Sequence, residues 1–378
     1  MENPFYLSGI IPERWFCDRE KETEWLTKTL VNGANVLLSS PRRMGKTQLI
    51  YHLFQQPEIR DNYYCFYTDI FPTSSLQELV LFLGKEICST LVPKGKSALD
   101  KFLSAIRSLS GSFTYDPVSG SPSFDVKLGD IHSPMLTIEE IFAYLEGAGK
   151  PCIFAIDEFQ QIAAYPEKNV EALLRSYIQK MNNCRFVFAG SNRHVLERMF
   201  NSAAKPFYNS AQQLYLDRIP EETYIAFAVK AFRESGRNIL PESVSYIYRM
   251  FDGHTYYVHN ILHNAIAYLG PGKTVDSADT DRLLSDILDE KGQTYAGMMN
   301  QLNYQQKEVI VAIARERKAK AITSVAFIKK HSLKSPSSVQ YAVAQLLEQQ
   351  LITYENEGRN KVFSLTDRFM QEWIRKVY

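Results

Sequence analysis

The chain has 378 residues, enough for two or three domains, and its 45% hydrophobic and 22% charged content is ordinary for a globular protein. A net charge of +1 excludes a global attraction to polyanions, so any surface for nucleic acid has to be local. The first residues lack a signal sequence and no apolar run approaches the roughly 18 residues of a membrane span, so we expect a cytoplasmic protein without a membrane partner.

The chain opens with an arm that contains prolines, and a helix is predicted behind it. The arm begins with the sequence N-P-F at residues 3–5. Asp18 is the predicted N-cap, because acidic residues follow it in the first turn. Leu26 and Leu30 then give the helix an apolar face, which predicts that this helix packs on a core.

The next stretch is typical of a phosphate-binding loop. An apolar run at 36–38 precedes the loop, and apolar residues at helical spacing follow it. In this context the backbone N–H groups converge on an anion, Lys46 reaches the β- and γ-phosphates, and the Thr47 hydroxyl ligates Mg²⁺. The predicted nucleotide-contacting residues are Ser40, Pro41, Arg42, Arg43, Met44, Gly45, Lys46, Thr47 and Gln48.

This loop departs from the consensus G-x-x-x-x-G-K-[ST] at its first position. Ser40 stands where the first glycine is expected, and a left-handed backbone would cost serine more than glycine. The alternative is a chance G-K-T sequence in front of a helix. The strand before the loop and the helix behind it favour the phosphate site.

Three buried strands predict an α/β fold. The run at 62–71 is rich in aromatic and other strand-forming residues, and the apolar runs at 152–157 and 185–190 show no alternation, which is typical of a parallel sheet covered on both faces. Helices are predicted between them, and alternating strands and helices favour a doubly wound P-loop core. The segment 92–134 is an insertion, with a helix over 98–109 and then a hairpin or an extended loop.

Polar residues at the ends of these strands are the other predicted site residues. Asp157 and Glu158 follow the second apolar strand, where Asp157 would hold Mg²⁺ and Glu158 would polarise the attacking water. Ser191 and Asn192 end the next strand and could contact the γ-phosphate or position that water; the alternative is a helix cap. Asp69 ends the 62–71 strand near the same edge, where its alternative role is a solvated cap.

From about Pro220 the sequence predicts helices only, over 221–235, 241–251, 255–268 and 277–290. The remainder has the order of a winged helix-turn-helix, with helices over 304–316, 324–331 and 336–349, a β-hairpin and a final helix. The predicted domains are therefore a P-loop ATPase core at 1–219, an all-α lid at 220–295 and a winged helix at 296–378.

The last unit is basic. Residues 301–378 hold 13 Lys and Arg against 7 Asp and Glu, a surplus of +6 that suits contact with a phosphate backbone. The candidate recognition helix at 335–349 has no arginine, the residue most used against guanine. Two roles of the winged helix remain open. It could contact DNA, or it could contact protein, either within the chain, on a partner or by self-association.

Five segments carry a resemblance to a known family: Asn3-Pro4-Phe5, Phe16-x-Asp18-Arg19-Glu20-x-Glu22, Ser40-Pro41-Arg42-Arg43-x-Gly45-Lys46-Thr47, Asp157-Glu158 and Gly190-Ser191. They resemble the archaeal-type ATPase family, which belongs with the AAA+ and STAND P-loop NTPases and is similar to origin-recognition ATPases. The resemblance covers nearly the whole chain, because family members commonly append a helical lid and a winged helix. It implies binding of ATP or ADP with Mg²⁺, slow hydrolysis and a nucleotide-dependent switch.

The resemblance also implies where the adenine base lies. The segment that contains Phe16 and Arg19 would lie near the base, and Gly253-His254-Thr255-Tyr256 resembles the Gly-His-Pro-Tyr element of the lid, which places His254 there too. Thr255 replaces the proline of that element. The segment 206–210 lacks the arginine that often ends its counterpart, so hydrolysis is expected to be weak or dependent on a partner.

Three functions follow from these observations. The first is an ATP-dependent switch with slow hydrolysis. The second is a DNA-binding regulator whose winged helix is controlled by the nucleotide domain. The third is a scaffold that binds nucleotide without hydrolysing it.

Overall fold

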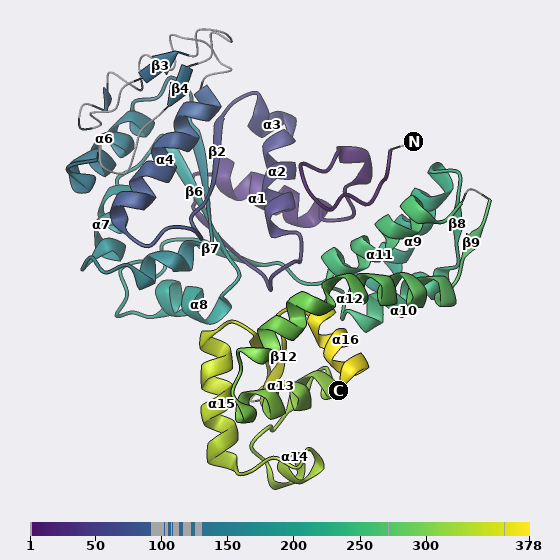
Figure 1. Ribbon diagram of the computed structural model, residues 1–378. Coiled ribbons are helices and arrows are strands. Elements are labelled where there is room, and N and C mark those ends of the chain that lie inside the picture. Colours follow the sequence, from purple (N-terminus) through teal and green to yellow (C-terminus); the bar gives the residue numbers. More distant parts are fainter. Residues whose placement is uncertain are drawn as a thin grey trace. The chain divides into compact units, whose positions relative to one another are not determined.

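The computed structural model describes residues 2–91, 102, 105–106, 108, 113–115, 122–124, 131–270, 272–358 and 360–378. Its contacts divide the chain into two compact units. One unit is Ile10–Ile219, and the other combines Met1–Gly9 with Pro220–Tyr378. Figure 1 shows the elements of both units in the order of the chain.

The unit Ile10–Ile219 is built on a parallel sheet of five strands with the order β2-β5-β6-β1-β7. The predicted α/β fold with a parallel P-loop sheet is therefore confirmed. The fifth strand was not predicted, because its sequence QQLY exposes two glutamines and has no apolar run. The strands are β1 (Val36–Ser39), β2 (Tyr64–Asp69), β5 (Cys152–Asp157), β6 (Cys184–Gly190) and β7 (Gln212–Tyr215).

Helices cover both faces of this sheet, and neighbouring residues of one strand face opposite cores. Leu37 of β1 belongs to one buried cluster, whereas Val36 and Leu38 belong to the other. The cluster of Val36 is covered by α1 (Glu20–Val31), α2 (Lys46–Gln55) and α3 (Pro57–Arg60). The cluster of Leu37 is covered by α4 (Leu76–Leu91), α6 (Pro134–Glu146), the 3₁₀ helix η4 (Phe159–Ala164), α7 (Val170–Ile178) and α8 (Arg193–Asn201).

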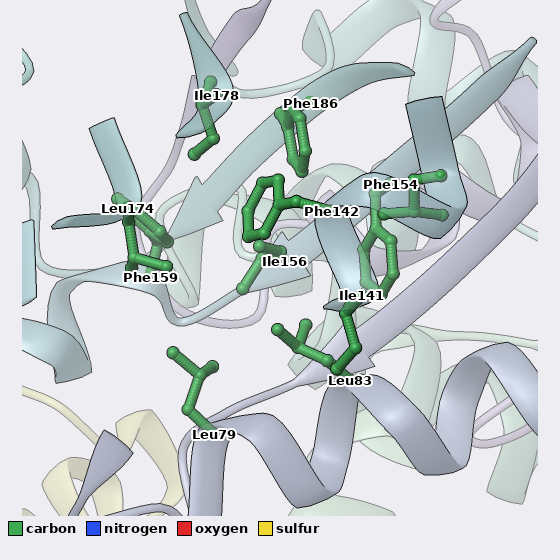
Figure 2. Close-up of a pocket in the computed structure, with 11 residues that line it drawn as sticks. Leu79, Leu83, Ile141, Phe142, Phe154, Ile156, Phe159, Leu174, Ile178 and Phe186 are labelled. Atoms are coloured by element: carbon green, nitrogen blue, oxygen red, sulfur yellow. The ribbon is translucent and has the colours of Figure 1, made fainter. Parts of the chain in front are cut away.

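Figure 2 shows the centre of the second core, where side chains of β5 and β6 meet those of α4, α6 and α7. The space between them is a cavity of about 10 Å³ lined only by aliphatic and aromatic residues, among them Leu79, Phe142 and Phe186. A water molecule needs about that volume and two to four polar partners as well, which this lining does not offer. The cavity is therefore part of a packed core and no ligand site.

Only part of the predicted insertion at 92–134 is described. The predicted helix over 98–109 lies mostly outside the described residues. Behind it, β3 (Phe113–Tyr115) pairs antiparallel with β4 (Pro122–Phe124), which is the hairpin alternative of the two that the sequence left open.

The helices predicted after Pro220 are present, but two features differ. Two short strands, β8 (Asn238–Ile239) and β9 (Thr274–Val275), pair in parallel, so the prediction of helices only is wrong. The last helix extends to residue 300 rather than 290, because Tyr295 and Met299 continue its buried face. The helices are α9 (Glu221–Glu234), α10 (Pro241–Met250), α11 (Thr255–Tyr268) and α12 (Ser277–Asn300).

The last part of the chain has the predicted winged helix order, with one additional strand. A two-residue strand, too short to give a pattern, completes a sheet of order β10-β12-β11. Among the described residues, every helix is too short or too polar to cross a membrane. The elements are α13 (Tyr304–Glu316), β10 (Ala319–Lys320), α14 (Val325–Lys330), α15 (Pro336–Glu348), β11 (Ile352–Glu357), β12 (Asn360–Leu365) and α16 (Arg368–Val377).

Residues 2–9 of the N-terminal arm belong to the unit of 220–378, although the sequence assigned them to the P-loop core. Phe5 is fully buried, with its ring 5.5 Å from the ring of Phe232 and 5.5 Å from that of His259. The Asn3 side-chain amide donates to the carbonyl of His263, whose Nδ1 lies 2.8 Å from the Phe5 carbonyl. The apolar ring and these hydrogen bonds explain the placement; the three-domain division itself stays a prediction.

His259 makes the stability of this unit depend on pH. Burial among Phe5, Tyr224 and Phe227 lowers the pKa of His259 from 6.5 to about 4. Below pH 6.5 the His259 imidazole is protonated in the unfolded chain, whereas in the folded chain it is protonated only below about pH 4. The free energy of unfolding therefore decreases as the pH falls through this window. We expect the free energy of unfolding to drop by about 2 kcal/mol more in the wild type than in His259→Phe between pH 7 and pH 4.5.

Urea unfolding of the full chain at the two pH values measures this difference. The comparison cancels the contribution of every other titrating group, because both proteins share them. An equal loss of stability in the wild type and in His259→Phe would contradict the assignment.

Candidate functional site

The loop behind β1 has the backbone that binding of an anion requires. Arg43 and Gly45 adopt left-handed conformations, with φ of 66° and 86°, and α2 begins at Lys46. Ser40 is not among the residues with positive φ, so the serine at the first consensus position costs no strain. It is fully buried, and its amide donates to the Gly190 carbonyl at 3.3 Å. The first amides of α2 lack helical partners, as at every helix N-terminus.

Lys46 and Asp157 form a buried ion pair beneath this loop. The side chains are 7% and 4% exposed, and Lys46 Nζ donates to Asp157 Oδ1. The second carboxylate oxygen of Asp157 accepts hydrogen bonds from Thr47 Oγ1 and from the Tyr67 hydroxyl, each at 3.0 Å. The structure thus joins three predicted residues, Lys46, Thr47 and Asp157, and adds Tyr67.

The charges of this cluster are set by the ion pair. Burial alone would raise the pKa of the Asp157 carboxyl, but the charge of Lys46 and hydrogen bonds from Lys46, Thr47 and the Glu158 amide lower it below 3.8. Burial, and the charge of Asp157 after it, raise the pKa of Tyr67, so its hydroxyl stays protonated and donates. At neutral pH the Asp157 carboxylate is therefore ionised and the Tyr67 hydroxyl is a neutral donor to it.

Glu158 lies beside this pair and connects it to the end of β6. One carboxylate oxygen, Oε1, is 4.0 Å from Lys46 Nζ. The other, Oε2, accepts from the Ser191 hydroxyl at 2.8 Å, from the Ser191 amide at 3.4 Å and from Gln160 Nε2. Arg42 of the loop donates from Nε to Ser191 Oγ at 3.3 Å. Predicted residues of three strand ends, Arg42, Glu158 and Ser191, therefore form one hydrogen-bonded chain.

Two residues at strand ends take their alternative roles. Asn192 caps α8, where its side-chain oxygen accepts from the Val195 amide at 3.3 Å. Asp69 pairs with Asp157 in the register of the sheet, but its carboxylate accepts from the Phe71 amide at 2.9 Å, as in a turn cap. Neither side chain joins the cluster of Lys46 and Glu158 in the contacts of the described chain.

Residues of the arm lie against α2 at the side of the loop. The Phe16 ring stacks on His52 at 3.9 Å with an interplanar angle of 10°. Gln48 accepts a hydrogen bond from the Ile11 amide at 3.2 Å. Arg19 is 4% exposed and donates to Glu22 at 2.7 Å and to the Asp217 carbonyl, so its guanidinium is engaged inside the core of this unit.

His254 belongs to the other unit. It follows a turn in which Asp252 and Gly253 have positive φ, and its Nδ1 lies 3.0 Å from the Phe251 carbonyl. The side chain is 5% exposed. Its contact with the adenine base, and those of Phe16 and Arg19, stay predictions.

Sequence reasoning missed two residues of the cluster. Tyr67 lies two positions before Asp69, the last residue of β2. Side chains two residues apart lie on the same face of a strand, so this spacing could have predicted Tyr67 as a residue of the site. Gln160 follows Glu158 by two residues inside η4. No sequence signal marks it, because its contact depends on Glu158 adopting a left-handed backbone with φ of 54°.

The fold and the loop behind β1 are those of a P-loop nucleoside triphosphatase. Residues 16–261 match the family of ATPase domains found predominantly in Archaea, and the chain belongs to that family, as the resemblance predicted. Residues 293–376 match a family of probable winged helix domains. The chain is therefore an ATP-binding P-loop ATPase with a winged helix behind it.

Individual proteins with similar sequence or fold agree with this assignment. An uncharacterized ATP-binding protein of Methanocaldococcus jannaschii is 24% identical over 255 residues, which are 63% of this chain and 68% of that protein. The Walker-type ATPase of Pyrococcus abyssi has a similar fold, with a TM-score of 0.67, 17% identity and coverage of 98% of this chain and 99% of that one. The ORC2 protein of Aeropyrum pernix, in ADPNP–ADP complexes, also has a similar fold, with a TM-score of 0.59 and 13% identity. The similarity covers 99% of this chain and 96% of that one.

Proposed function

We propose that this protein is an ATP-dependent switch that hydrolyses ATP slowly, with Mg²⁺, to ADP and phosphate. The observation that carries the proposal is the buried pair of Lys46 and Asp157 directly beneath the loop, with the Glu158 carboxylate 4.0 Å from the same ammonium group. A buried lysine next to a phosphate-binding loop can exchange its carboxylate partner for the phosphates of a bound triphosphate. The same lysine then links binding to the strand that carries Glu158.

In the binding step, the loop amides and Lys46 hold the phosphates. The Lys46 ammonium would move its hydrogen bond from Asp157 to the phosphate oxygens, which accept charge-assisted hydrogen bonds as a carboxylate does. Asp157 keeps the hydrogen bonds from Thr47 and Tyr67, so its carboxylate remains oriented. Ser40, Pro41, Met44 and Gln48 shape the loop, and the exposed Arg43 lies at its rim.

The donor set suits Mg²⁺. The Thr47 hydroxyl and the Asp157 carboxylate are 3.0 Å apart, and Mg²⁺ prefers such hard oxygen ligands, few of them from protein, with phosphate and water completing the octahedron. When bound, the ion would neutralise charge on the phosphates. Both residues would hold it, Thr47 directly and Asp157 through water.

In the hydrolysis step, Glu158 would accept a proton from the attacking water. Its Oε1 faces Lys46, and thus the place of the terminal phosphate, whereas Oε2 is anchored on Ser191. Ser191 and Arg42 would contact the γ-phosphate, because Arg42 donates to the Ser191 hydroxyl and that hydroxyl donates to Glu158 at the same edge of the sheet. Asn192 would act here only if it left its cap on α8.

The switch would run through the turn that carries His254. Beside that turn, Tyr257 donates to the Thr366 carbonyl at 3.3 Å, and Asp252 pairs with Lys318 at 2.6 Å. Both partners lie in the winged helix part of the chain, so a nucleotide that contacts His254 could change the position of the winged helix. An origin among AAA+ or STAND ATPases and a cytoplasmic location belong to the same proposal.

Removal of the metal tests this function. We expect the wild type to release phosphate from ATP slowly with Mg²⁺, and chelation by EDTA to reduce the rate to the level of Lys46→Ala. Adding excess Mg²⁺ after EDTA should restore the rate, which shows that the loss is not damage to the fold. A release rate that is equal with and without Mg²⁺ would contradict the proposal.

The DNA-binding regulator remains a second candidate, and the basic surplus of the winged helix favours it. Ser337 and Gln340 at the start of α15 are exposed, as a helix that reads a groove requires. Binding to duplex DNA that weakens steeply with salt would support this candidate. A chain that binds ATP but never hydrolyses it would instead support the scaffold.

A further inference from the structure

We infer that Gln160 is a positioning residue for Glu158: its amide holds one carboxylate oxygen of Glu158 so that the other faces the phosphate site. The inference rests on the proposed hydrolysis. It names a residue that no motif of this sequence singled out, and it assigns a reason for the glycine at position 190.

The two oxygens of the Glu158 carboxylate have different surroundings. Oε2 receives the Gln160 amide together with the hydroxyl and the backbone amide of Ser191. Oε1 receives none of these and lies 4.0 Å from Lys46 Nζ. Three donors on one oxygen fix both the place and the rotation of the carboxylate. A base that has to meet one water molecule needs this kind of orientation.

The Gln160 side chain has no other hydrogen-bonded use among the described residues. Its Oε1 is buried and has no hydrogen-bond partner in the described chain, which is an unfavourable state for an amide oxygen. Turning the amide over would put that oxygen against the Glu158 carboxylate, where two acceptors repel. The contact with Glu158 therefore determines how the amide is oriented.

Gly190, the last residue of β6, makes room for this amide. A Cβ at position 190 would overlap Gln160 Oε1 and would lie 2.9 Å from Leu196 Cδ1, closer than real Cβ atoms approach. The φ of Gly190 is not positive, so the glycine is required by the close approach and not by the backbone. A side chain at this position therefore displaces the Gln160 amide that contacts Glu158.

The backbone of Glu158 supports the same interpretation. Its φ of 54° is a left-handed conformation that costs energy in a residue with a side chain. This conformation starts η4, with Gln161 N donating to the Glu158 carbonyl at 2.9 Å, and thereby brings residue 160 back beside residue 158.

The experiment compares Gln160→Met and Gly190→Ala with the wild type in steady-state ATP hydrolysis, calorimetric ATP binding and thermal unfolding. Methionine at position 160 keeps the length of the side chain and removes the amide that donates to Glu158. Alanine at position 190 fills the space that the Gln160 amide occupies. For each variant we expect kcat to fall on the order of 10- to 100-fold, with KM and the ATP dissociation constant within about twofold of the wild type. A residue that only stabilises the fold would not separate kcat from KM in this way.

Gln161→Met is the matched control, because the Gln161 amide donates to the Thr73 carbonyl at 3.1 Å and not to Glu158. It should keep the wild-type kcat, and the double variant of positions 160 and 190 should be no slower than the slower single variant. Wild-type turnover in Gln160→Met, or an equal loss in Gln161→Met, would overturn the inference while hydrolysis itself stands. A wild type no faster than Glu158→Gln would overturn the proposed hydrolysis, and this inference with it.

Discussion

Replacing Lys46 with alanine is expected to weaken ATP binding by roughly 10- to 150-fold, the loss that follows when charge-assisted hydrogen bonds worth about 1.5–3 kcal/mol are removed. The side chain is 7% exposed and sits where the loop meets α2, so no other ammonium group of the described chain can take its place at Asp157. Calorimetric titration of both proteins with ATP and Mg²⁺ measures the change.

The same substitution is expected to destabilise the protein without nucleotide. It leaves the Asp157 carboxylate, 4% exposed, without its counter-ion, and breaking a buried pair in this way costs about 3 kcal/mol or more. Lys28→Ala is the matched control, because Lys28 pairs with Glu24 on the surface of α1, at 70% and 63% exposure, and should change neither quantity measurably. Equal ATP affinity in the wild type and Lys46→Ala would remove Lys46 from the site.

Replacing Glu158 with glutamine is expected to reduce kcat by about 10²- to 10⁴-fold, the usual contribution of a general base. The substitution keeps the shape of the side chain and removes the proton acceptor that faces Lys46. ATP binding should stay within a few fold of the wild type, because the loop, Lys46 and Thr47 are unchanged. Single-turnover hydrolysis with radiolabelled ATP separates the two quantities.

Glu171→Gln serves as the control for this substitution. Glu171 lies in the same unit and pairs with Lys205 at 2.8 Å on α7, away from the loop. It should hydrolyse ATP as the wild type does. Unchanged turnover in Glu158→Gln would exclude Glu158 as the base and would favour the scaffold among the three functions.

The sequence predicted well those elements whose burial is continuous. The run CIFAID is buried at every position, so the strand Cys152–Asp157 has the predicted bounds. The helices of the winged helix part agree within about two residues, because each carries a cap and an apolar period. The strands β7, β8, β9 and β10 were missed, because runs of two to four residues with at most two apolar side chains are too short to give a pattern.

The site shows the same division between local and distant information. The residues Lys46, Thr47, Asp157 and Glu158 belong to motifs that are local in sequence, and the structure brings them together. Gln160 could not be predicted, because its role follows from a backbone conformation of its neighbour and from the space left by a glycine on another strand. Ser40 was expected to carry strain, but the left-handed positions of the loop are Arg43 and Gly45.

The N-terminal arm shows how tertiary packing overrides sequence order. Residues 3–5 precede the P-loop unit directly, yet Phe5 is buried among rings of α9 and α11, more than 200 residues further along the chain. The proline and the phenylalanine of residues 3–5 do not indicate in which core the ring packs. Such a placement follows only from the contacts.

The central claim is that the loop of residues 40–47 binds the phosphate tail of ATP or ADP. Calorimetric titration of the purified wild type with ATP and with ADP, in Mg²⁺ and after removal of any nucleotide that copurifies, tests it most directly. The account predicts saturable heat with one nucleotide bound per chain. Absence of heat with both nucleotides, from a protein that unfolds cooperatively, would contradict it.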